Sequence, residues 1–177
     1  MKFYNIILFI LIFSLTGCFF FNSNNSQESR EIEKGDDFFT SGDVDKALQL
    51  WQQSLDKKKT VQVYEKIIMA YIIKNDLSAA EKWTQEGLSY FPSDVNLLFN
   101  HSLINYHKNE YLVALEGFDR VLSVDKHYPN AHFLKGMIYE KMGHKEEAKK
   151  EFVNEININP GSGKTWLKIR EEAKNGK

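Results

Sequence analysis

The 177-residue sequence is poor in cysteine, proline and net charge. It contains one cysteine and three prolines, and its formal net charge is −1. A balanced charge creates no overall field that would favour nucleic acid or an acidic surface. The G-x-S-x-G and H-E-x-x-H motifs of hydrolases and metalloproteases are also missing. We therefore expect no catalytic residues, no metal site, no cofactor and no nucleic-acid partner.

The segment PGSGKTW at 160–166 resembles the end of a phosphate-binding loop. That motif requires G-x-x-x-x-G-K-[ST] after a buried strand and before a helix. Its first glycine would fall at position 158, where the sequence has Ile158. Because this glycine is missing, we expect no nucleotide site and interpret the segment as a turn that leads into a C-terminal helix.

The N-terminus has the organisation of a secretory signal. A positive start is followed by the apolar run IILFILIF at 6–13, which is too short for a stable transmembrane helix. The next residues, LTGC at 15–18, resemble the bacterial lipobox, in which cleavage precedes a cysteine that carries lipid. We predict a lipoprotein signal peptide at 1–17, then a lipidated Cys18 that begins a flexible tether at 18–27. The alternative is an ordinary signal peptide with a chance cysteine.

Lipidation of Cys18 would have two consequences. It would use the only thiol, so none would remain for catalysis, a disulfide or a metal. It would also hold the protein at a membrane by acyl chains, facing the periplasm or the cell surface. Residue 19 is Phe19 and not the aspartate that retains lipoproteins at the inner membrane in some bacteria, which favours the outer membrane.

A repeat runs through the rest of the chain. Its clearest marks are four alanines at a nearly constant interval: Ala47, Ala80, Ala114 and Ala148. Apolar residues at helical spacing precede each alanine. Short breaks divide each unit into two helices, at Gly42, Asn75, Asn109 and Gly143. The sequence therefore predicts four consecutive helical hairpins of 33 or 34 residues each.

This pattern resembles the tetratricopeptide repeat, W-x₂-L-G-x₂-Y, then A-x₃-F, then P. The fourth repeat matches best, with Gly136-x₂-Tyr139, Ala148-x₃-Phe152 and Pro160. The resemblance implies an all-α superhelix of four helical hairpins plus a C-terminal capping helix. The expected repeats are 28–60, 61–94, 95–128 and 129–162, with the capping helix at 163–177. We expect Trp166 to be the packing anchor of that last helix.

In this family the first helices of successive hairpins line a concave groove. The register places mostly apolar residues there: Ile32, Phe39, Met69, Ile72, Phe99, Leu103, Tyr106, Phe133 and Met137. Exposed apolar patches usually mark binding sites, so we expect an apolar peptide or helix of a partner protein to bind in this groove. The alternative is that a tight superhelix or the tether covers these residues.

Some members of the family grip the terminal carboxylates of a peptide with lysine and asparagine on the first helices. Here the matching positions hold Ile32, Asp36, Glu65 and Met69. Such a clamp would lack its cations, so we expect no binding of this kind.

Two histidines, His127 and His132, straddle Pro129 in a predicted loop between hairpins, and their spacing does not indicate a metal site. The combined expectation is a non-enzymatic, membrane-anchored scaffold that holds a protein partner in the bacterial cell envelope. The resemblance suggests outer-membrane protein assembly, pilus assembly or recruitment of cell-wall enzymes, without choosing among them. A self-associating structural lipoprotein is the alternative.

Overall fold

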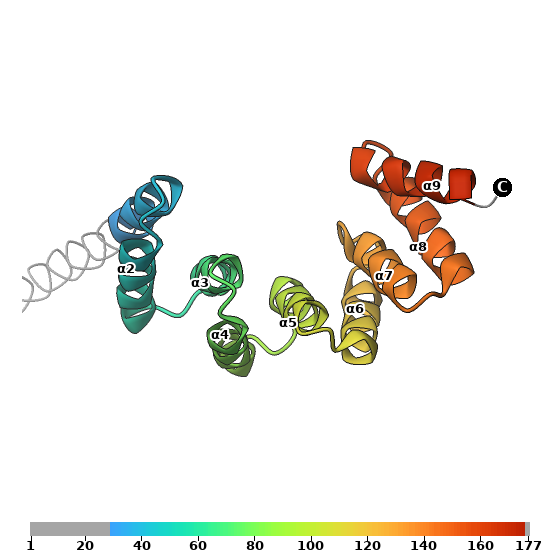
Figure 1. The fold of residues 1–177 in the computed structure, drawn as a ribbon. Coiled ribbons are helices and arrows are strands. Elements are labelled where there is room, and N and C mark those ends of the chain that lie inside the picture. The colour runs from blue at the N-terminus through green and yellow to red at the C-terminus, as the bar shows by residue number, and fades with distance from the viewer. Residues whose placement is uncertain (1–28, 176–177) are drawn as a thin grey trace, which may run out of the picture. The chain divides into compact units, whose positions relative to one another are not determined.

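The computed structural model describes residues 29–175, with side chains through residue 169. The predicted signal peptide, Cys18 and tether lie outside these residues. Within them, every regular element is a helix. The first runs over 29–40, and the others are α2 (Val44–Lys57), α3 (Val61–Ile73), α4 (Leu77–Tyr90), α5 (Val95–His107), α6 (Tyr111–Val124), α7 (Ala131–Lys141), α8 (Lys145–Ile158) and α9 (Gly163–Asn175). The predicted all-α class, with hairpins followed by one further helix, is confirmed (Figure 1).

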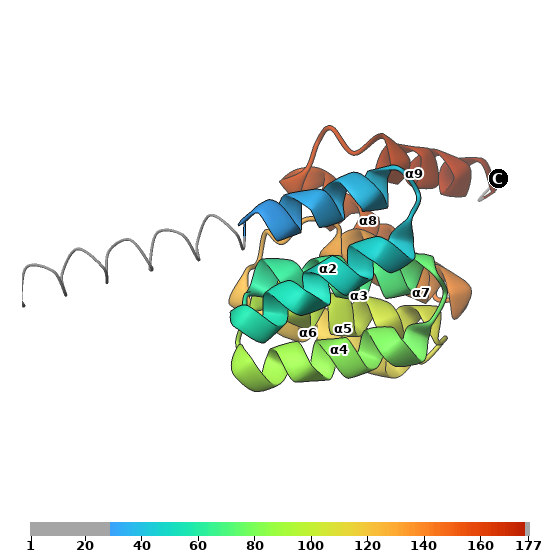
Figure 2. The same cartoon turned by 90° about the vertical axis from the view of Figure 1, so that its left-hand side faces the viewer.

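The chain divides into two compact units between Ile67 and Ile68, inside α3. In the second unit, neighbouring helices pack in chain order, α4 on α5, α5 on α6, α6 on α7, α7 on α8 and α8 on α9. Seen from the side in Figure 2, α4, α5 and α6 lie along one another. No helix within residues 29–175 has both the length and the hydropathy that crossing a bilayer requires.

All four hairpin turns have the same backbone geometry. Gly42, Asn75, Asn109 and Gly143 adopt the left-handed conformation, with φ of 90°, 58°, 61° and 82°. In each turn the next N–H donates to the carbonyl five residues back, as from Asp43 to Phe38 and from His144 to Tyr139. This is the Schellman arrangement, which satisfies carbonyls left free at a helix end. Glycine and asparagine tolerate positive φ best, so these residue types stop the first helix at the predicted positions.

A glycine facing an aromatic ring lets the two helices of a hairpin approach closely. In the first unit, a Cβ on Gly35 would overlap the indole of Trp51, which is 2% exposed. In the second unit, a Cβ on Gly136 would lie 2.5 Å from Cε1 of the fully buried Phe152. The same two positions, counted by the period, hold a glycine and a large ring in both units.

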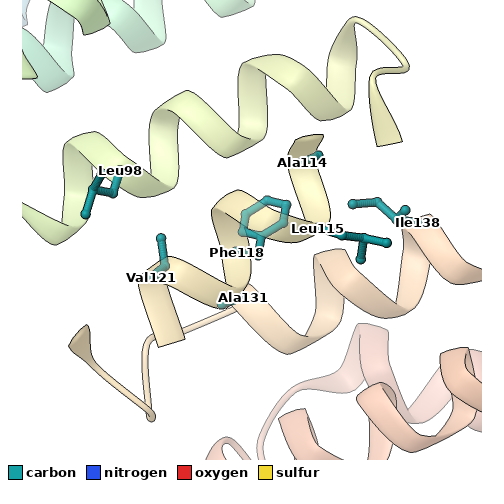
Figure 3. Close-up of a cluster of buried hydrophobic side chains, with 7 residues drawn as sticks. All are labelled: Leu98, Ala114, Leu115, Phe118, Val121, Ala131 and Ile138. Carbon is teal, nitrogen blue, oxygen red and sulfur yellow. The ribbon is translucent and has the colours of Figure 1, made fainter. Parts of the chain in front are cut away.

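The central hairpin of the second unit has a cluster of buried apolar side chains (Figure 3). They come from α5, α6 and α7: Leu98, Ala114, Leu115, Phe118, Val121, Ala131 and Ile138. Phe118 on α6 is fully buried among them. Burial of such a side chain contributes about 2–3 kcal/mol, so this cluster holds consecutive hairpins together and fixes the register between them.

The expected role of Trp166 is wrong. Its side chain is 48% exposed, and its Nε1 donates to the carbonyl of Pro160 at 2.9 Å, while the neighbouring Thr165 is fully buried. One repeat earlier, the equivalent His132 is covered by the second helix of its own hairpin, through Glu151 on α8. The described residues contain no corresponding second helix after α9.

Candidate functional site

Both predicted groove residues of the first unit lie beside the indole ring of Trp51. Ile32 and Phe39 are both half-buried on the first helix. The Phe39 ring centroid lies 5.4 Å from that of Trp51. The carbonyl of Ile32 accepts a hydrogen bond from the Trp51 Nε1 at 3.4 Å. Phe39 is therefore partly used in packing its own hairpin.

In the second unit, the predicted residues lie on the first helices of successive hairpins. We call this set the first-helix face; its predicted members are Met69, Ile72, Phe99, Leu103, Tyr106, Phe133 and Met137. All are half-buried except Met69, which is 41% exposed. Phe99 on α5 and Phe133 on α7 are one repeat apart, as are Leu103 and Met137. The helical register therefore repeats one apolar surface from α5 to α7.

The two phenylalanines of this face also pack inward. The Phe99 ring lies 5.5 Å from Phe118 and 4.9 Å from Tyr128, measured between centroids. The Phe133 ring lies 5.8 Å from Phe152. Each ring therefore contributes one side to the core and leaves the other side partly accessible.

Sequence reasoning missed one member of the first-helix face. Leu167 follows Phe133 by the same interval that separates Phe133 from Phe99, and it lies on α9. Its side chain is 57% exposed, more than any of the predicted members. Counting the period once more beyond Phe133 would have found it. With Leu167 included, the apolar row runs across α5, α7 and α9.

Three lysines make contacts between neighbouring first helices along this face. The Lys141 ammonium lies 5.9 Å from the Tyr106 ring centroid, and the Lys164 ammonium lies 4.5 Å from that of Phe133. Lys168 on α9 forms an ion pair with Glu140 on α7, at 3.0 Å. These contacts join α5 to α7 and α7 to α9 along the face and give it a positive border.

A buried carboxylate fixes the start of α7, and sequence reasoning missed it. Glu155 on α8 is fully buried and accepts hydrogen bonds from the backbone N–H groups of Asn130 (3.2 Å) and Phe133 (3.3 Å). The side chain of Asn130, the N-cap residue, makes no capping bond of its own. Glu155 therefore satisfies helix N–H groups that would otherwise lack acceptors. The signal for it was a glutamate at a position where the earlier repeats have Gly87 and Val121.

A second buried carboxylate joins three helices. Glu151 on α8 contacts His132 Nδ1 at 2.5 Å and Lys135 Nζ at 2.8 Å, and Lys135 also pairs with Asp119 on α6 at 2.7 Å. Burial raises the pKa of Glu151, but the hydrogen bonds and charges of His132 and Lys135 outweigh it and lower that pKa to about 2. Burial likewise lowers the pKa of Lys135, and its bonds to Asp119 and Glu151 reverse this and raise it.

The placement of His132 in a loop between hairpins is wrong. The chain passes Pro129 and Asn130 (φ 66°) and enters α7 at Ala131, so His132 lies in the first helical turn. There it faces Glu151 and is unavailable as one of a ligand pair with His127. In the described part of the chain no group of three or more His, Cys, Asp or Glu side chains could hold a metal ion.

The comparisons with known proteins agree with this geometry. Residues 129–161, which include α7 and α8, match the family model of the tetratricopeptide repeat. The crystal structure of MamA superposes with a TM-score of 0.68 at 20% identity, covering 80% of this chain and 84% of that one. The fold is that of the tetratricopeptide repeat. YrrB, whose structure is described as a tetratricopeptide repeat protein with an unusual peptide-binding site, gives a TM-score of 0.66 at 14% identity over 81% of this chain and 74% of that one.

Among curated proteins, sperm-associated antigen 1 of Rattus norvegicus is 27% identical over 101 residues. The match covers 57% of this chain but 11% of that relative's length, so it concerns a small part of a much longer protein. The tetratricopeptide fold explains the four Schellman turns and the glycine–ring contacts seen above. It leaves the chemistry of the first-helix face to the side chains of this particular sequence.

Proposed function

We propose that this protein is a non-enzymatic, lipid-anchored adaptor that holds a partner protein at the bacterial envelope. The partner would place an apolar peptide or helix against the first-helix face. The observation that supports this most is the row of Phe99, Phe133 and Leu167 at equivalent positions of three successive first helices. Repetition of an exposed or half-buried apolar side chain at one register position is typical of a surface that binds an apolar segment.

Photo-crosslinking from Leu167 tests the binding face. A photoreactive amino acid at Leu167, in cells, is expected to capture a defined partner. The matched control is Val153, which is 42% exposed on the second helix α8. Leu167→Gln is expected to reduce the same capture from a crosslinker at Met69. Equal capture from Leu167 and Val153 would contradict the proposed face.

Substitution of both Phe99 and Phe133 by glutamate is a less specific test, since both rings also pack against core rings. Loss of capture in that variant could result either from lost binding at the face or from lost packing of the two rings in the core. Leu167→Gln avoids this because most of the side chain lies in solvent. Unchanged far-UV circular dichroism should accompany the loss of capture.

The anchor is tested separately at Cys18. Metabolic labelling with a radioactive fatty acid is expected to mark the wild-type chain and not Cys18→Ser. The variant should move from the membrane fraction to the soluble fraction, because acyl chains supply the membrane affinity. Density-gradient separation of the two membranes then tests the proposed outer-membrane location. Label on Cys18→Ser, or wild-type chain in the soluble fraction, argues against the anchor.

A further inference from the structure

Lys46 and Lys66 in the first unit differ from Lys141 and Lys164 in the second, although each of these lysines lies over an aromatic ring. In the first unit, Lys46 lies over Phe38 and pairs with Asp43 at 2.6 Å. Also in that unit, Lys66 lies over Trp51 and pairs with Asp36 at 2.8 Å. Both ammonium groups therefore have a carboxylate partner as well as a ring.

Lys141 and Lys164 of the second unit have no such carboxylate partner among the described side chains. Lys141 lies over Tyr106 and Lys164 over Phe133, both on the first-helix face. No carboxylate among the side chains described for residues 29–169 forms an ion pair with either lysine. Both lysines are exposed. The face therefore presents two cations held over apolar rings with no anion among those side chains to pair with them.

Glu140, the residue before Lys141, pairs with Lys168 on α9. Among the side chains described for this part of the face, Lys141 and Lys164 are therefore the two lysines placed over rings without a carboxylate partner. Electrostatic complementarity between partners selects a ligand of opposite sign and speeds its association. An apolar row bordered by two such cations therefore fits an apolar segment that carries carboxylates at its sides.

We propose that the α7–α9 part of the first-helix face binds an acidic amphipathic segment of another protein. Its apolar side chains would contact Met137 and Leu167, and its Asp or Glu side chains would pair with Lys141 and Lys164. This inference rests on the proposed function, because it names the partner chemistry of the same face. Recognition of an anionic lipid surface typically takes a cluster of about 4–8 Lys or Arg side chains. Two lysines beside an apolar row fit better a peptide that places its carboxylates only at those lysines.

Peptide selection on the purified full-length protein tests the inference without knowledge of the natural partner. A displayed library of random linear peptides is expected to yield sequences with apolar residues and a net negative charge. A synthetic copy of a selected peptide should bind about tenfold more weakly to Lys141→Glu/Lys164→Glu than to the wild type. The affinity should also fall as salt is raised, because salt screens exposed charges.

The control is the double variant Lys149→Glu/Lys150→Glu, which makes the same change of net charge on exposed lysines of α8. It is expected to bind the selected peptide as the wild type does. Selection of neutral or basic peptides would overturn the inference. The inference would also fail if the face variant and the control variant lowered the affinity for the selected peptide equally. Binding of Cys18→Ser to phosphatidylglycerol vesicles through Lys141 and Lys164, without any acidic peptide selected, would overturn it in favour of a lipid.

Leu167→Gln separates failure of this inference from failure of the proposed function. If neutral peptides are selected and Leu167→Gln weakens them, the face binds apolar segments and only the acidic chemistry is wrong. If Leu167→Gln leaves every selected peptide unaffected, the face is not the binding site and both proposals fail. If the peptides are acidic and both variants weaken them, both proposals are supported.

Discussion

The two units of the chain use the same hairpin frame but treat charge differently. In the first unit the ion pairs lie at the surface, as with Asp36 and Lys66, whose side chains are 41% and 25% exposed. In the second unit Glu151 and Lys135 are paired at 10% and 9% exposure, while Lys141 and Lys164 have rings but no carboxylate among the described side chains. The backbone pattern of the repeat thus leaves electrostatics free to vary. The second unit also has surface pairs such as Lys168 with Glu140, at 26% and 37% exposure, so what distinguishes it is the addition of a buried pair.

The largest difference between the units should appear when one carboxylate of each is neutralised. Glu151→Gln leaves a buried ammonium with one partner fewer, and we expect a loss of about 3 kcal/mol in the free energy of unfolding. Asp36→Asn removes a surface pair, and we expect a loss below about 1 kcal/mol. Urea unfolding followed by far-UV circular dichroism measures both. Equal losses would mean that burial does not distinguish the two pairs.

The pH dependence of stability should come from the same buried carboxylate. The pKa of Glu151 lies at about 2 in the folded chain against an ordinary value of 4.5. Because the pKa of Glu151 is lower in the folded chain than in the unfolded chain, the ionised carboxylate stabilises the fold at pH values above 4.5. This stabilisation is lost as the pH falls from 4.5 towards 2. The loss amounts to about 3 kcal/mol. Unfolding curves between neutral and acidic pH should therefore converge for wild type and Glu151→Gln as the pH falls, because protonated Glu resembles Gln. A gap that stays constant would contradict the assignment.

A smaller effect, shared by the two units, should follow from filling the glycine–ring contacts. In Gly136→Ala the added Cβ would lie 2.5 Å from the Phe152 ring, and in Gly35→Ala it would meet Trp51. Alanine favours the helix by about 1 kcal/mol, but overpacking costs up to about 3 kcal/mol, so we expect a net loss of about 2 kcal/mol in each. Gly163→Ala is the control, since no atom lies within 4 Å of its added Cβ. Unchanged stability in either buried variant would show that the rings can shift.

The fold could be predicted because its determinants are local and periodic. Gly42 and Asn109 end helices through their own backbone conformation, and an apolar residue every turn marks the buried side. Gly136 and Phe152 belong to the two helices of one hairpin, so their contact follows from the register. Such features repeat along the chain and reinforce one another, which makes them visible without a structure.

The departures from the repeat could not be predicted with equal ease. From the sequence alone, Glu155 and Glu151 resemble ordinary solvent-exposed glutamates. No neighbouring residue indicates that Glu155 reaches the start of α7 or that Glu151 reaches His132. The exposure of Trp166 depends on whether another helix covers α9, which is a property of the neighbours rather than of the residue. The positions of Lys141 and Lys164 over rings depend on side-chain conformations across two helices. The candidate site was thus predictable as an apolar row, and its charges were not.

The smallest expected effect concerns the two kinds of lysine. Lys164→Met keeps the aliphatic stem and removes the cation over Phe133, and we expect it to cost less than about 1 kcal/mol of unfolding free energy. Lys66→Met removes both a ring contact and the partner of Asp36, so it should cost more than Lys164→Met. Urea unfolding of the two variants side by side gives the order directly. If Lys164→Met is the more destabilising, Lys164 serves the fold, and the argument for an external carboxylate at that position loses its basis. If it is the less destabilising while binding of an acidic peptide is lost, Lys164 contributes to recognition rather than to stability.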